Sequence, residues 1–95
     1  MPTTTKQTLT AGAGYGAPVF ILGTGATVTA IPGGSGTSTV QYTTSSAQDV
    51  NAGLATWISW PAGDVSVATA DTLAGLVTAV HANATTSNAT LEVCQ

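Results

Sequence analysis

The chain has 95 residues, of which 43% are hydrophobic, 5% are charged and only one is Lys or Arg. This length fits one small domain, and a net charge of −3 offers no basic surface for a phosphate backbone, so we expect no nucleic-acid partner. No run of about 18 apolar residues is present and the first residues lack a signal-peptide pattern, so we expect no membrane span and synthesis inside the cell.

The first third of the chain alternates β-like segments with glycine-rich breaks. Residues 3–10 are polar on both sides and predict an edge strand or an extended arm, and residues 11–16 predict a loop. Residues 19–22 are continuously apolar, which predicts a strand buried on both faces. Residues 26–31 alternate apolar and polar positions and follow a turn at 23–25, so we expect the two runs to pair as a hairpin.

The remainder continues in the same way. Residues 37–44 predict a strand with Val40 and Tyr42 on one side. Residues 46–53 predict a single helical turn between an N-cap serine and a terminal glycine. The other expected elements are a strong strand at 54–60 ended by Pro61, a turn at 62–64, a short edge strand at 65–67, a connection at 71–75, and strands at 76–82 and 89–94 joined by a polar link at 83–88.

These segments predict an all-β protein with seven or eight short antiparallel strands. We expect one domain over residues 1–95, a small β-sandwich that is either immunoglobulin-like or jelly-roll-like. A domain of this size buries only about two-thirds of its unfolded surface. The single cysteine, Cys94, allows no internal disulfide. Self-association is therefore the expected additional source of stability.

Residues that could support chemistry are few. His81 is the only histidine, and no nucleophile motif accompanies it. The glycines of residues 12–16 imitate a phosphate-binding loop, but a strand-like segment follows them where that motif needs a helix. The acids occur singly, which is typical of turns and strand surfaces rather than of metal or acid–base sites. We therefore expect no enzymatic activity, no cofactor and no metal site. The four acids are Asp49, Asp64, Asp71 and Glu92.

The two tryptophans are the most informative side chains. Trp57 and Trp60 are three residues apart on the predicted strand, so they project to opposite faces. One can fill the core, and the other needs cover from another segment, a subunit or a sugar. Tryptophan is also frequent among the residues that dominate binding interfaces. We name Trp57, Trp60, Tyr15 and Lys6 as candidate interface residues, with ordinary packing of both tryptophans as the alternative.

Residues 55–65 (ATWISWPAGDV), 76–82 (LVTAVHA) and 89–95 (ATLEVCQ) resemble small β-sandwich proteins of tailed-bacteriophage virions. Over about residues 40–95 the chain is most similar to accessory chains that decorate or cement phage heads. The resemblance implies a structural virion protein, made in the bacterial cytoplasm, that binds the major capsid protein on the capsid surface as a dimer or trimer. It carries over no functional residue. The alternative is a tail or fibre module that binds host surface carbohydrate through Trp57 or Trp60.

Overall fold

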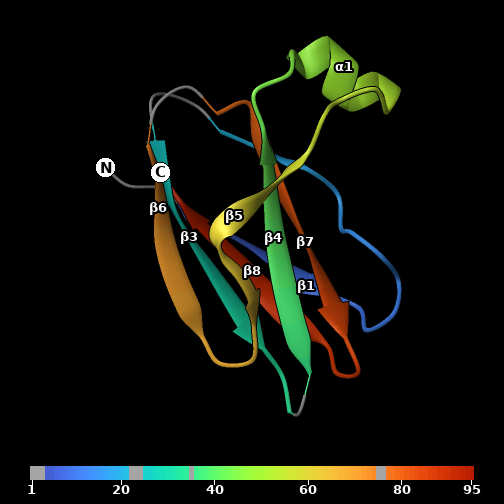
Figure 1. The fold of residues 1–95 in the computed structure, drawn as a ribbon, viewed down its shortest axis with the longest axis vertical. Coiled ribbons are helices and arrows are strands. Elements are labelled where there is room, and N and C mark those ends of the chain that lie inside the picture. The colour runs from blue at the N-terminus through green and yellow to red at the C-terminus, as the bar shows by residue number, and fades with distance from the viewer. Residues whose placement is uncertain (1–3, 22–24, 35, 75–76) are drawn as a thin grey trace.

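The computed structural model describes residues 4–21, 25–34, 36–74 and 77–95, which form eight strands and one short helix (Figure 1). In chain order the elements are β1 (Thr4–Leu9), β2 (Val19–Phe20), β3 (Gly25–Pro32), β4 (Thr37–Thr43), α1 (Ala47–Ala52), β5 (Ile58–Val65), β6 (Thr69–Ala74), β7 (Ala79–Thr85) and β8 (Ala89–Cys94).

The strands form two four-stranded antiparallel sheets, in the orders β1-β8-β3-β6 and β2-β7-β4-β5. In this order β1 pairs with β8, β2 with β7, β3 with β6 and β4 with β5. The chain is therefore one long hairpin whose successive pairs alternate between the two sheets, which is the jelly-roll arrangement. The predicted all-β sandwich is confirmed, and of the two expected topologies the jelly roll is observed.

The hydrophobic core lies between the two sheets. Every second residue of β3, β4, β7 and β8 points inward, as the alternating sequence of β3, β4 and β8 predicted. Fully burying one such Val or Leu stabilises the fold by about 1.5 to 3 kcal/mol. The largest side chain of the core is Trp60. The core residues with no exposed surface are Val28, Ala30, Val40, Val80, Ala82, Leu91 and Val93.

Several local predictions are confirmed. β1 is an edge strand that pairs with β8. Strands β4 and β8 lie within the ranges predicted from their alternating polar and apolar residues, and Val40 and Tyr42 both face the core. The predicted helical turn is α1. The Ser46 hydroxyl accepts a hydrogen bond from the backbone N–H of Asp49, and Gly53 ends the helix with a φ of 75°.

The predicted hairpin of residues 19–22 with 26–31 is wrong. β2 contains only Val19 and Phe20, which are half-buried rather than fully buried, and it pairs with β7 at the edge of one sheet. β3 belongs to the other sheet. The turn predicted at 23–25 lies mostly outside the described residues. The apolar run marks a crossing between the sheets, and its third residue, Ile21, is buried in the core.

The prediction that Pro61 ends a strand begun at residue 54 is also wrong. β5 begins at Ile58 and continues through Pro61 to Val65. Residues 60–63 lie opposite the single residue Val40, so this part of β5 is a bulge. An edge strand accepts proline because the missing N–H has no partner to lose on its free side. The residues predicted as a turn at 62–64 therefore belong to the strand.

The residues predicted as a connection at 71–75 lie largely in β6. Asp71 is opposite Val28 and therefore points toward the core side at the free edge of the sheet. An inward-pointing charge at a sheet edge discourages pairing with another strand. Because aspartate is also common in turns, the sequence alone predicted a connection here. β7 begins three residues later than predicted and includes Asn83, which had been placed in a link.

Candidate functional site

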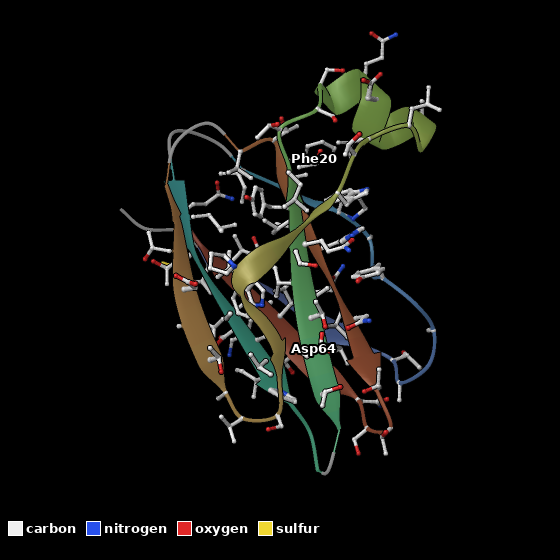
Figure 2. The ribbon with its side chains drawn as sticks, in the orientation of Figure 1. Phe20 and Asp64 are labelled. Atoms are coloured by element: carbon white, nitrogen blue, oxygen red, sulfur yellow. The ribbon has the colours of Figure 1, made fainter. Side chains whose placement is uncertain are left out.

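The outward side of the sheet β2-β7-β4-β5 carries an unusual set of side chains. Val80, Ala82 and Ala84 of β7 face the core, so His81 and Asn83 between them face outward. We call this side the aromatic face. It contains Tyr15, Phe20, Thr39, Gln41, Trp57, Ser59, Asp64, His81 and Asn83, and in Figure 2 Phe20 and Asp64 lie near opposite ends of β4 on this side.

Three aromatic rings from distant parts of the chain are stacked at the centre of this face. The Tyr15 and His81 ring centroids are 4.2 Å apart with planes inclined by 20°. The Trp57 and His81 centroids are 3.6 Å apart with planes inclined by 15°. His81 is therefore only 8% exposed although it lies on the outer side of its sheet, while Tyr15 is 40% exposed and Trp57 is half-buried.

Backbone hydrogen bonds to β7 position Tyr15. The backbone N–H groups of Gly12 and Gly16 donate to the carbonyl oxygens of Ala84 at 3.0 Å and Ala82 at 2.9 Å. The glycine-rich loop thus continues the pairing along β7 beyond the short strand β2. Tyr15 lies between these two anchors, which explains how a residue of a glycine-rich loop keeps a defined ring position over His81.

Hydrogen bonds around the end of β4 position Trp57. The Thr43 hydroxyl donates to the carbonyl oxygen of Thr56 at 2.7 Å, and the backbone N–H of Thr56 donates to the Ser45 hydroxyl at 3.1 Å. Thr56 is the neighbour of Trp57 in the chain, so these bonds fix the backbone from which the indole projects. The connection after α1 is therefore the element that brings Trp57 onto the aromatic face.

His81 is held as a neutral ring. Its Nε2 is 2.8 Å from the Gln41 Oε1, and because an amide oxygen only accepts, Nε2 carries the proton and donates. Burial lowers the pKa of His81 from 6.5 to about 4. A catalytic triad would pair this histidine with a carboxylate and a hydroxyl. The observed partners of His81 are instead an amide and two aromatic rings, so His81 is the centre of a stacked aromatic cluster.

Lowering the pH is expected to destabilise the protein through His81. Unfolded histidine has a pKa of about 6.5, so between about pH 6.5 and 4 the unfolded chain binds more protons and the free energy of unfolding falls. The stabilising contribution of neutral His81 is fully present above about pH 6.5. Between that pH and about pH 4 we expect the free energy of unfolding to fall by about 1 to 2 kcal/mol, a value already lowered because solvent screens the edge of the ring. Urea unfolding at both pH values, with His81→Phe as the non-titrating control, measures it. An equal pH dependence in the two proteins would contradict this account.

The four candidate interface residues lie in three different places. Tyr15 and Trp57 meet on the aromatic face. Lys6 lies on the outer side of the other sheet, where its Nζ is 3.4 Å from a carboxylate oxygen of Glu92. Trp60 is 2% exposed, and its Nε1 donates to the carbonyl oxygen of Gly63 at 2.7 Å. Trp60 is therefore a core residue of the folded chain, which is the ordinary packing that the sequence left open as the alternative.

Neither His81 nor Gln41 was predicted to belong to this site. His81 was considered only as a possible catalytic residue, and nothing in the local sequence shows that Tyr15 and Trp57 cover it. Their meeting depends on the strand order, because β4 and β7 are neighbours only in the folded jelly roll.

Among the described residues no three His, Cys, Asp or Glu side chains come together as metal ligands would. The six-residue helix α1 is too short to cross a membrane, and no longer helix occurs in the part of the chain that the structure describes. The chain matches no family model, and neither a curated protein nor a solved structure is significantly similar to it.

Proposed function

We propose that the chain is a structural component of a tailed-phage virion, a head decoration protein that binds the lattice of the major capsid protein on the capsid surface. It acts without catalysis and without a cofactor, and it self-associates as a dimer or trimer. The observation that carries the proposal is the outward side of the sheet β1-β8-β3-β6, a continuous surface lined by hydroxyl groups.

This surface, which we call the threonine face, spans all four strands of its sheet. Cross-strand partners on one side of a sheet share a face, so the outward residues follow from the register. The surface contains one Lys and one Glu, which are cross-strand partners and form an ion pair. Its outward residues are Thr4, Lys6, Thr8, Thr27, Thr29, Ile31, Ala70, Thr72, Thr90, Glu92 and Cys94.

Such a surface suits contact with a protein lattice. The centres of protein interfaces are depleted in charged residues, because an unpaired charge loses its hydration without compensation. Here Lys6 and Glu92 already neutralise each other, and each threonine offers a methyl group for packing beside a hydroxyl for hydrogen bonding. Jelly rolls also occur in viral capsid and lectin domains, an analogy of fold that supports the proposal without deciding between the two roles.

The first test is the position of the wild-type chain in a density gradient of native phage particles, with mass spectrometry across the fractions. We expect it to track filled heads at a fixed copy ratio to the major capsid protein. Tracking isolated tails would favour the alternative, a tail or fibre module that binds host carbohydrate. Remaining at the top of the gradient would contradict both virion roles.

Thr27→Arg tests the docking surface itself. Thr27 is exposed in the row of the threonine face that it shares with Cys94 and Thr72, so arginine there adds an unpaired cation to the contact while leaving the core unchanged. We expect its copy number on heads to fall at least tenfold, equivalent to about 1.4 kcal/mol of binding free energy. The matched control is Ser59→Arg, an exposed position on the opposite sheet, which should remain on heads. If Ser59→Arg were lost from heads while Thr27→Arg remained, the capsid contact would lie on the aromatic face instead.

A further inference from the structure

We propose that the aromatic face binds a neutral saccharide, with Tyr15 and Trp57 as stacking surfaces and with Gln41, Asn83 and Asp64 as hydrogen-bonding groups. This site lies on the sheet opposite the threonine face, so the inference does not rest on the proposed capsid contact. A chain docked by one sheet would present the other sheet to solvent.

The stacked rings supply the apolar part of such a site. A sugar ring has a face of C–H groups that packs on an aromatic ring, while its hydroxyl groups point outward to polar partners. Tyr15 and Trp57 each place one ring face against His81, so the second face of each is turned away from it. Tyr15 is 40% exposed, and its ring is therefore open to solvent as a stacking surface.

Amide and carboxylate groups beside the rings supply the polar part. Gln41 uses Oε1 to hold His81, and Asn83 uses Oδ1 to accept from the backbone N–H of Thr39 at 2.9 Å. In the described part of the chain, the amide nitrogens of these two side chains form no hydrogen bond. Asp64 accepts from the Thr39 hydroxyl through Oδ1. Each side chain is thus fixed by one atom and leaves another for a ligand.

The register places these groups within reach of one sugar ring. His81, Gln41 and Ser59 form one row across β7, β4 and β5, and Asn83, Thr39 and Asp64 form the next row. Adjacent rows on one side of a sheet are about 7 Å apart, and neighbouring strands about 4.8 Å. A ring stacked beside His81 would therefore place its hydroxyl groups over the second row.

Charge selects the class of sugar. The only Lys or Arg of the chain is Lys6, which lies on the opposite sheet and is paired with Glu92. The aromatic face instead carries the carboxylate of Asp64. Sialylated, sulfated and phosphorylated glycans would meet no compensating cation there and would be repelled by Asp64. Amide and carboxylate groups suit the uncharged hydroxyl groups of a neutral hexose.

The site is rigid before any ligand arrives. The loop that carries Tyr15 is anchored to β7 and also to β1, because the Gln7 Nε2 donates to the carbonyl oxygen of Ala17 at 3.0 Å. The His81 ring is fixed by Gln41 and by both stacked rings. Groups that are already ordered lose little conformational entropy on binding, so weak individual contacts can add to a measurable affinity.

A protein partner is the less suitable occupant of this face. The centre of a protein interface is depleted in charged residues, whereas Asp64 lies directly in the polar row of the aromatic face. Unpaired amide nitrogens are costly when covered by an apolar surface. A ligand dense in hydroxyl groups satisfies both the carboxylate and the amides, which is the chemistry of a saccharide.

The test is titration of the purified chain with methyl β-glucoside, methyl α-mannoside, lactose and cellobiose, with 3′-sialyllactose as the anionic comparison. Isothermal titration calorimetry gives the affinity. Tryptophan emission reports the site, because Trp60 is buried in the core and a bound sugar changes the environment of Trp57 alone. We expect at least one neutral sugar to bind with a dissociation constant of about 1 mM or tighter, and 3′-sialyllactose to bind at least tenfold more weakly than lactose.

Two substitutions of one residue provide the matched comparison. Tyr15→Phe keeps the ring and should change the affinity by less than about twofold, whereas Tyr15→Ala removes it and should weaken binding at least tenfold. Lys6→Ala, on the opposite sheet, should have no effect. Because Tyr15 is exposed, both variants are expected to fold, which circular dichroism checks. Absence of binding by every neutral sugar, or equal affinity of Tyr15→Ala and wild type, would overturn the proposal. Neither result would alter sedimentation with phage heads, so the two proposals fail separately.

Discussion

Replacing Trp60 with alanine is expected to lower the free energy of unfolding by about 3 to 5 kcal/mol. Trp60 is the largest of the fully buried side chains, and its removal leaves a cavity between the sheets that the surrounding valines cannot fill. The substitution also removes the donor for the Gly63 carbonyl oxygen, the bond that closes the bulge of β5. A domain of this size has a total stability of about 5 to 14 kcal/mol, so the variant is expected to be close to unfolding at room temperature.

Urea unfolding followed by circular dichroism measures this loss, and Trp57→Ala is its natural control. Both substitutions remove an indole, but Trp57 packs on one ring face of His81 at the surface. Its removal should cost about 1 kcal/mol, the scale of one aromatic pair. Trp60→Phe, which keeps most of the buried volume, should fall between the two. A larger loss for Trp57→Ala than for Trp60→Ala would contradict the assignment of these residues to face and core.

The parts of the fold that could be predicted from the sequence depend on local contrast between polar and apolar residues. β3, β4 and β8 each alternate cleanly because one side faces the core and the other side faces solvent. The α1 boundaries could be predicted because Ser46 and Gly53 have specific conformational roles at helix ends. These signals involve neighbours in the chain, so they need no knowledge of the topology.

The wrong predictions concern sheet edges and the segments between sheets. There, a residue type that usually marks a turn, a strand end or a buried strand serves a different purpose in the fold. Pro61 is typical of a strand end but lies within the bulged edge strand β5. Asp71 is typical of a turn but lies in the edge strand β6, where its inward-pointing charge discourages pairing with another strand. Residues 19–22 resemble a buried strand, but in the described part of this run β2 is a two-residue edge strand paired with β7 and Ile21 is buried in the core. In each case the position of the strand within its sheet decided the outcome, and that position is a property of the whole fold.

The candidate site could be predicted only in part for the same reason. Trp57 and Trp60 were named together because one of two tryptophans on opposite sides of a strand needs cover, and Tyr15 was named as an interface residue. Their joint contact with His81 follows from the pairing of β7 with β4 and from the loop bonded along β7. The sequence separates these three rings widely, and the jelly-roll order brings them together on one face.

A second large effect is expected where the chain crosses between the sheets. The β3–β4 connection and the β7–β8 connection pack against each other by their backbones, and Gly36 lies against the carbonyl oxygen of Thr85 and the amide of Ser87. A Cβ atom at residue 36 would overlap both backbone groups, which cannot rotate away as a side chain can. Gly36→Ala is therefore expected to lower the free energy of unfolding by about 2 to 3 kcal/mol.

Gly53→Ala is the control that separates the steric overlap of an added Cβ atom from the backbone cost of replacing a glycine. Gly53 has a φ of 75° but no atom within 4 Å of an added Cβ, so alanine there meets only the backbone penalty of about 1 kcal/mol. Thermal unfolding of both variants compares the two costs directly. Equal losses would mean that the two connections can move apart, and close backbone packing would then not hold the crossing strands in place. A larger loss for Gly36→Ala would identify this packing as a requirement for joining the two sheets, and hence for placing the two proposed binding faces on opposite sides of the molecule.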